Sequence, residues 1–126
     1  MPLYWTIDSR QKLVTVTCEG DVTSADLADY MDAVEGARAL TYCKLFDGTA
    51  FQTSMTALEM LEIGVRFRSY HTRPIGPLAI VLPPDKADLF ARVLGILAAA
   101  DRPMRVFTRL APARRWIEAF VRVPSE

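Results

Sequence analysis

The sequence contains little histidine and little cysteine, and this shortage excludes a class of metal-dependent proteins. Its 126 residues include one histidine and two cysteines, without the close spacing of Cys, His and carboxylates that a structural zinc site needs. Cys18 and Cys43 stand in apolar, strand-like surroundings and are expected to be buried thiols in a reducing compartment. We therefore expect no metal and no cofactor.

Long hydrophobic runs are also absent. The longest, residues 77–82 and 93–100, fall well short of the roughly 20 apolar residues that a transmembrane helix needs. The first twelve residues, MPLYWTIDSRQK, lack the basic-then-apolar order of a secretory signal. These features predict a cytoplasmic protein with no membrane insertion.

Familiar catalytic motifs are missing as well. The chain has no G-x-S-x-G, no P-loop and no G-x-G-x-x-G. The one histidine, His71, falls near an expected helix C-terminus, where a surface or capping role is favoured over a catalytic one. Asp8, Asp47 and Asp101 stand near the ends of expected elements, as turn-forming or capping carboxylates do. The protein is therefore not expected to be an enzyme.

The net charge is zero, but the charges are unevenly distributed. Residues 1–65 hold ten acids and four bases, whereas residues 66–126 hold five acids and eleven bases. This asymmetry predicts either a dipolar surface or, less favoured because the arginines are dispersed, a basic face for an anionic partner. Nucleic-acid binding is disfavoured by the neutral charge and by the lack of a basic aromatic patch.

The pattern of the chain predicts a single α/β domain over residues 1–126. About half of the residues (51%) are hydrophobic, which suffices for a sizeable core. Strands alternating with helices predict a mixed five-stranded sheet that begins with an N-terminal β-hairpin and carries four helices mainly on one face. The expected strands are 3–8, 13–18, 42–47, 77–82 and 104–108. The expected helices are one capped by Thr23 or Ser24 and ending near Gly36, one at about 55–70, one at about 85–100 and a closing helix with Pro112 in its first turn.

The helix expected at 55–70 carries two apolar stripes. A helix that packs on a sheet needs only one. We expect the first stripe to cover the sheet and the second to meet a neighbouring helix, a second subunit, an apolar ligand or a partner. Glu62 and Arg66, at the i, i+4 spacing of an ion pair, belong to a polar ridge between the stripes. The first stripe is Met55, Leu58, Leu61 and Val65, and the second is Met60, Ile63, Phe67 and Tyr70.

Hydroxyl residues precede this helix and have two interpretations. Thr56 and Glu59 match the capping-box pattern T-x-x-E, and Thr53 or Ser54 would cap the helix slightly earlier. Capping is the favoured role. The alternative is phosphorylation, because a phosphate at a helix N-terminus is stabilised by the dipole and by free N–H groups.

The layout resembles the STAS fold of sulfate transporters and anti-sigma-factor antagonists, and most closely the small bacterial SpoIIAA-like proteins. The resemblance rests on the N-terminal hairpin, the apolar strand LAIVL and the closing ARRWIEAF segment. In the antagonists a strand leads through a glycine turn to a serine that a partner kinase phosphorylates. Gly48 matches the turn glycine, Phe51 the apolar residue before the switch and Ser54 the serine, while Thr53 replaces an aspartate.

The resemblance implies a non-enzymatic, cytoplasmic regulatory or protein-interaction module, whose partner is another protein or a second copy of the chain. The alternative is a carrier or sensor of a small apolar or anionic molecule, with Arg66, Arg68 and Arg73 as candidate anion-binding residues. The candidate phosphorylation site is Ser54. The candidate partner or ligand surface comprises Phe51, Thr53, Ser54, Met60, Ile63, Phe67 and Tyr70.

Overall fold

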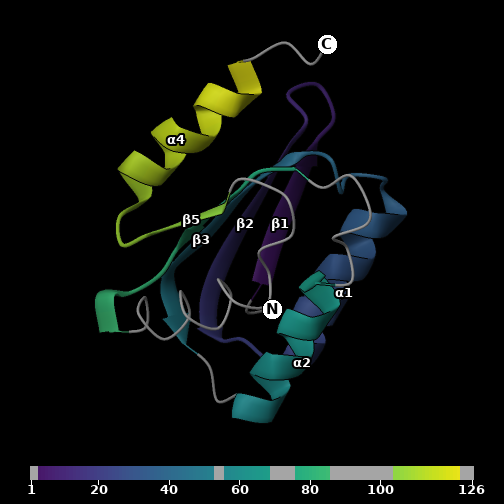
Figure 1. The fold of residues 1–126 in the computed structure, drawn as a ribbon, viewed down its shortest axis with the longest axis vertical. Helices are drawn as coiled ribbons and strands as arrows, with labels where there is room; N and C mark the ends of the chain where they lie inside the picture. Colours follow the sequence, from purple (N-terminus) through teal and green to yellow (C-terminus); the bar gives the residue numbers. More distant parts are fainter. Residues whose placement is uncertain (1–2, 53–55, 69–75, 86–103, 123–126) are drawn as a thin grey trace.

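The computed structural model describes residues 3–52, 56–68, 76–85 and 104–122, which form a five-stranded sheet with helices on both faces (Figure 1). The α/β class and the mixed five-stranded sheet are thereby confirmed. The described elements are β1 (Leu3–Asp8), β2 (Leu13–Asp21), α1 (Ser24–Gly36), β3 (Cys43–Gln52), α2 (Ala57–Arg68), β4 (Leu78–Val81), β5 (Met104–Phe107) and α4 (Leu110–Arg122). Beyond its first residue, the helix expected at 85–100 lies outside these ranges. Among the described helices, none is long and apolar enough to cross a membrane.

The strands lie in the sheet in the order in which they occur in the chain, β1-β2-β3-β4-β5. β1 and β2 form the expected antiparallel hairpin, with Leu3 opposite Cys18 and Asp8 opposite Leu13. All later neighbours are parallel. In such an order, crossovers of one hand place the connecting helices on the same face.

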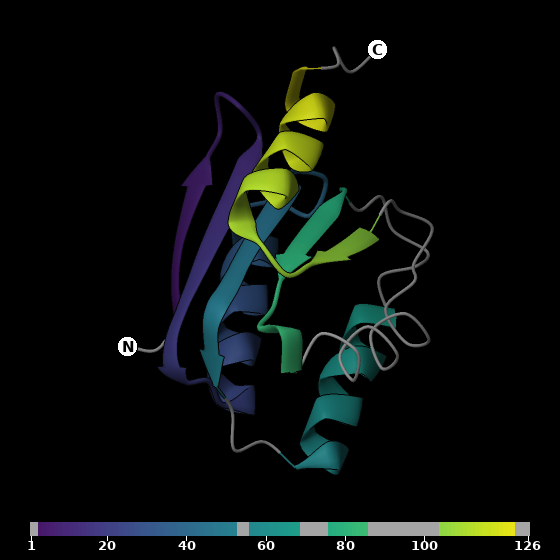
Figure 2. The same ribbon diagram turned by 90° about the vertical axis from the view of Figure 1, so that its left-hand side faces the viewer.

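Among the described helices, α4 is the exception to the expected placement mainly on one face. The helices α1 and α2 share a face, while α4 covers the opposite one (Figure 2). The helix α4 follows β5 and connects no two described strands. The handedness rule for crossovers between parallel strands therefore does not decide which face of the sheet it covers. Its buried residues Ala113 and Ile117 pack on Leu45, Ala79 and Val81 of the sheet. Trp116 extends this contact to Phe107 of β5, with ring centroids 6.0 Å apart.

The larger core lies between the sheet and α1. It contains alternate residues of β2 and the expected apolar face of α1, which begins after the N-cap Thr23 and ends at Gly36. The strand β4 is buried on both faces, as its continuous apolar run predicts. The residues of β2 and α1 in this core are Val14, Val16, Cys18, Leu27, Tyr30, Met31 and Val34.

The strand β3 is longer than expected, because it continues past Asp47 to Gln52. Its pairing with β2 jumps from Thr17–Asp47 to Glu19–Ala50, so β3 holds one extra residue, as in a β-bulge. One extra residue reverses the alternation of side chains, and Phe51 therefore joins the larger core.

Gly48 stands at this bulge and not in a turn, which corrects its assignment as the turn glycine. A Cβ atom at this position would lie 2.5 Å from the carbonyl oxygen of Val81, in the neighbouring strand β4. Only glycine permits the two backbones to approach this closely.

Lys44 is a charged residue inside the fold, with 5% of its surface exposed. Its Nζ donates to the carbonyl oxygens of Leu40 at 2.6 Å and Tyr42 at 2.9 Å. These bonds connect β3 to the segment that follows α1. The carbonyls solvate the ammonium in place of water, which is what makes a buried lysine tolerable.

Candidate functional site

The N-terminus of α2 is closed by the capping box that the sequence predicts. The Thr56 hydroxyl accepts a hydrogen bond from the Glu59 N–H at 3.1 Å, and the Thr56 N–H donates to the Glu59 carboxylate at 3.1 Å. Hydrogen bonds from the Thr56 N–H and from the Ser24 hydroxyl lower the pKa of Glu59 from its ordinary value of 4.5. Thr53 and Ser54 lie outside the described residues, so phosphorylation of Ser54 stays a prediction.

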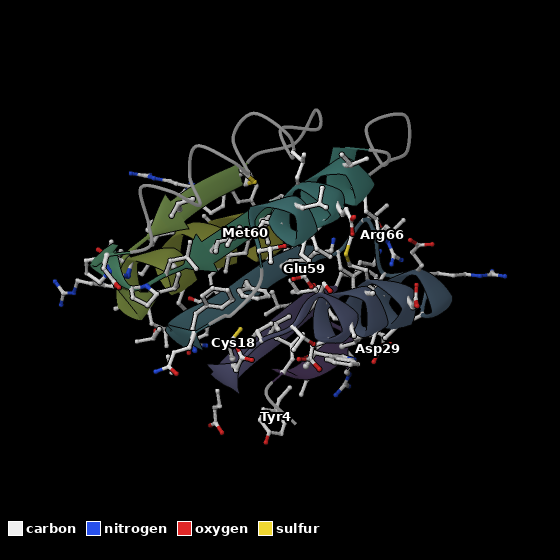
Figure 3. The ribbon with its side chains drawn as sticks, turned by 90° about the horizontal axis from the view of Figure 1, so that it is seen from below. Tyr4, Cys18, Asp29, Glu59, Met60 and Arg66 are labelled. Atoms are coloured by element: carbon white, nitrogen blue, oxygen red, sulfur yellow. The ribbon has the colours of Figure 1, made fainter. Side chains whose placement is uncertain are left out.

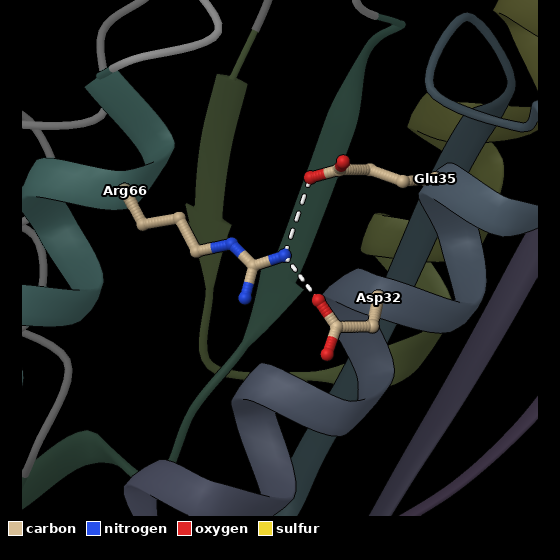
Figure 4. A network of polar contacts seen from close by, with 3 residues as sticks. All are labelled: Asp32, Glu35 and Arg66. Atoms are coloured by element: carbon tan, nitrogen blue, oxygen red, sulfur yellow. Dashed lines mark hydrogen bonds and ion pairs between the residues drawn. The ribbon is translucent and has the colours of Figure 1, made fainter.

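Polar side chains join α2 to α1 near both ends of the helix pair. The Ser24 hydroxyl donates to Oε2 of Glu59 at 3.1 Å. Further along, Nη2 of Arg66 contacts Oδ1 of Asp32 at 2.7 Å and Oε1 of Glu35 at 3.2 Å (Figure 4). Glu59 and Arg66 therefore both lie on the side of α2 that meets α1 (Figure 3).

The pairing of Arg66 corrects one expectation from the sequence. The i, i+4 spacing predicted an ion pair with Glu62 on the same helix, but Arg66 turns to the carboxylates of α1. The cross-helix pair is favoured because two carboxylates converge on one guanidinium. Glu62 is exposed and makes no ion pair within the described part of the chain.

These polar contacts set the rotation of α2, and the rotation reverses the expected roles of the two stripes. From the second stripe, Ile63 packs against the larger core and Met60 is half-buried. From the first stripe, Leu58, Leu61 and Val65 are 64%, 45% and 56% exposed. At 100° per residue these three side chains lie on the side of α2 opposite Ile63. We call Leu58, Leu61 and Val65 the aliphatic ridge.

The other predicted surface residues fall in different places. Phe51 is 3% exposed, so it is a core residue and offers no surface to a partner. Tyr70 and Arg73 lie outside the described residues, as do the side chains of Phe67 and Arg68. Of the predicted set, the structure places Phe51 and Ile63 in the same core, while Arg66 faces α1.

Arg66 is poorly suited to the anion-binding role that the sequence suggested. Its guanidinium already contacts the carboxylates of Asp32 and Glu35. Those two negative charges would repel an anionic head group placed beside them.

The carboxylates of Asp8 and Asp47, which the sequence singled out, make hydrogen bonds within the fold. Oδ1 of Asp8 accepts the N–H groups of Arg10 and Gln11, and Oδ1 of Asp47 accepts the Thr49 hydroxyl at 2.6 Å. Asp8 acts as a turn former, as predicted, whereas Asp47 lies inside β3 just before the bulge, which corrects its expected place at a strand end. Asp101 lies outside the described residues, as does His71. Within the described ranges, no group of three or more His, Cys, Asp or Glu residues could hold a metal ion.

Cys18 is buried, as expected, whereas Cys43 is only partly buried, which corrects the expectation of two buried thiols. Burial raises the pKa of Cys18 to about 12, with Asp47 adding a smaller repulsive contribution. Burial also raises the pKa of Cys43. Since the thiolate is the nucleophile, neither cysteine is suited to catalysis at neutral pH.

No protein-family model, curated protein or solved structure matches this chain. The STAS-fold resemblance therefore stays a prediction based on the order of elements.

Among the described helices, α1 is the acidic one, with four carboxylates and no arginine, whereas α2 carries two carboxylates and two arginines. Helices α1 and α2 together carry six carboxylates and two arginines, whereas α4, on the opposite face, carries three arginines and one glutamate. Asp29 and Glu62 are exposed, and the side chain of Asp32 is 70% exposed despite its ion pair.

Sequence reasoning missed the ridge because it treated α2 alone. Glu59 and Arg66 are seven residues apart and therefore share a side of the helix. Asp32 and Glu35 offer the complementary charges on α1. Matching these charges between the two helices would have predicted that Leu58, Leu61 and Val65 face the solvent.

Proposed function

We propose that this protein is a non-enzymatic regulatory module that binds another protein through the aliphatic ridge of α2. The observation that carries the proposal is the exposure of Leu58, Leu61 and Val65, which is 64%, 45% and 56%. Single exposed aliphatic residues are common on protein surfaces, but these three follow the i, i+3, i+7 spacing of the anchors that a helix presents to a partner.

Two further points support an interaction role. Polar contacts connect α2 to α1 near both ends of the pair, Ser24 with Glu59 at one end and Arg66 with Asp32 and Glu35 at the other. The ridge is therefore presented on a pre-organised support. The order of elements is similar to that of anti-sigma-factor antagonists, which act through protein contacts. The alternative of a small-molecule carrier has no comparable observation in its favour, because Arg66 is engaged by carboxylates.

A photo-cross-linking amino acid placed at position 61 tests the proposal in the cells that make the protein. We expect a covalent adduct with one partner protein. The same amino acid at position 4 is the control, since Tyr4 is 50% exposed but belongs to the edge strand β1. The adduct from position 61 should disappear when Leu58 and Val65 are changed to serine. Equal adducts from both positions, or no adduct from position 61, would contradict the proposal.

A further inference from the structure

Three aromatic rings form a row where α4 packs beside the edge strand β5. The ring centroids of Phe107 and Trp116 are 6.0 Å apart, and those of Trp116 and Phe120 are 4.9 Å apart. The row continues into a cation, because the guanidinium carbon of Arg105 lies over the Phe107 ring, 5.2 Å from its centroid. All three aromatic residues are partly exposed, so the row borders the solvent.

Arginines flank this row from both elements. At about 100° per residue, the buried Ile117 lies on one side of Trp116 around α4, and the exposed Arg115 lies on the other. On β5, Arg105 and Phe107 are two residues apart and therefore share the face of the sheet that α4 covers. The rings thus lie between a guanidinium from the helix and one from the strand.

The arginines of this region are not neutralised by carboxylates. Arg105, Arg109 and Arg115 are exposed and make no ion pair within the described part of the chain. The carboxylate of α4, Glu118, lies about 160° around the helix from Trp116. We define the arginine–aromatic patch as these three arginines and the three rings, namely Arg105, Phe107, Arg109, Arg115, Trp116 and Phe120.

The composition of the patch decides among anionic partners. Guanidinium groups recognise phosphates, and aromatic rings stack on bases. In a duplex the bases stack on one another, so only an unpaired strand offers a base to the rings. An acidic protein segment would use the arginines but not the rings. A membrane surface would need apolar residues to insert, and Ala113 and Ile117 of α4 are already buried against the sheet.

We propose that the arginine–aromatic patch binds a single-stranded nucleic acid, with the arginines on its phosphates and the rings against its bases. The zero net charge of the chain does not oppose this, because salt screens exposed charges beyond about 10 Å at 0.1 M. The activity is separate from docking at the aliphatic ridge, since α2 and α4 lie on opposite faces of the sheet (Figure 2). The sequence showed no such patch because its residues come from two elements that tertiary packing brings together.

Fluorescence anisotropy with two labelled 12-nucleotide strands, oligouridylate RNA and oligothymidylate DNA, tests the proposal on the full-length protein. We expect a dissociation constant in the micromolar range at 50 mM NaCl. Three phosphate contacts give a salt slope of about −2 for a single strand, so raising NaCl to 150 mM should weaken binding about tenfold. Binding of both strands, or of one alone, supports the proposal and tells whether RNA or DNA is the source. Polyglutamate of the same length should not displace the strand.

Matched variants separate the two contributions. Arg105→Ala and Arg115→Ala should each weaken binding about fivefold and make the salt slope shallower by about 0.7. Arg38→Ala is the control and should change binding less than twofold, since Arg38 is exposed but follows α1, which covers the other face. Phe120→Leu keeps an apolar side chain but removes a ring, and should weaken binding about tenfold at an unchanged salt slope. Circular dichroism of each variant verifies that the fold is retained.

Each outcome decides the proposal. Weaker binding in the two patch arginine variants and in Phe120→Leu, with Arg38→Ala unchanged, supports it. Binding of neither strand, or equal weakening by Arg38→Ala, would overturn it. Binding that is insensitive to Phe120→Leu, or that polyglutamate displaces, would make an acidic protein segment the occupant and would also overturn it. None of these results bears on the cross-link at position 61, so the proposed function is tested separately.

Discussion

Replacing Gly48 by alanine should destabilise the protein strongly, because β3 and β4 approach closely at this position. The new Cβ atom would lie 2.5 Å from the Val81 carbonyl oxygen, below the 3.0 Å that real Cβ contacts essentially never pass. It would also lie 3.3 Å from a methyl carbon of Leu82. The first of these contacts is with backbone, so a side-chain rotation cannot relieve it.

The backbone of β4 has little freedom to yield. Val81 lies between Asp47 of β3 and Phe107 of β5, and the Leu82 N–H donates to the Phe107 carbonyl at 2.9 Å. Overpacking of this kind costs about 1–3 kcal/mol, and we expect the upper end of that range because the clash is with a central strand. With an m-value of about 2 kcal/mol/M, the urea midpoint should fall by about 1.5 M.

Urea unfolding followed by circular dichroism measures this effect, with Gly36→Ala as the matched control. Gly36 ends α1, and a Cβ atom there meets nothing within 4 Å. Alanine is favoured over glycine in helices by up to about 1 kcal/mol, so the control midpoint should be unchanged or higher. If Gly48→Ala unfolds at the same urea concentration as the wild type, the bulge is wrong and Gly48 belongs to a permissive turn.

Three further perturbations test other parts of the structure. Lys44→Met should lower the free energy of unfolding, measured by urea unfolding, by about 2 kcal/mol, because the Leu40 and Tyr42 carbonyls lose a charged donor. An unchanged free energy would contradict the buried contact. The lowered pKa of Glu59 contributes stability above pH 4.5 that is lost as pH falls through the folded-state pKa. Glu59→Gln should therefore flatten the decline of the urea midpoint below pH 4.5, and an unchanged slope would refute this. Cys18 should resist iodoacetamide at pH 8 until urea unfolds the chain, and rapid labelling by mass spectrometry would disprove its burial.

Local patterns sufficed where one face of an element decides its packing. The β-branched run of β2 predicted a strand, and the continuous apolar run of β4 predicted a strand buried on both faces. For α1 an N-cap at Thr23 or Ser24 and an end near Gly36 were predicted, and the structure has Thr23 as the N-cap. These features depend on residues that are close in the chain.

Features that depend on distant residues were not predictable in the same way. The bulge at Gly48 reverses the alternation of β3, so the segment from Gly48 to Gln52 shows no strand periodicity. The two stripes of α2 are similarly apolar, and the choice between them depends on the Arg66 contacts with Asp32 and Glu35, more than 30 residues away. The face covered by α4 is likewise decided by tertiary packing.

The strands have the same order in the sheet as in the chain, and this order affects how the sheet can form during synthesis on the ribosome. Each strand that emerges adds to the edge that the previous strand left open, and no strand has to be inserted between two that are already paired. The hairpin of β1 and β2 provides the first edge, and the parallel strands extend it in one direction. Since N-terminal parts of a chain emerge first, the sheet can be assembled while translation continues. The helix α4 follows β5 and covers the second face, so the apolar surface of Leu45, Ala79 and Val81 stays open until α4 has been made.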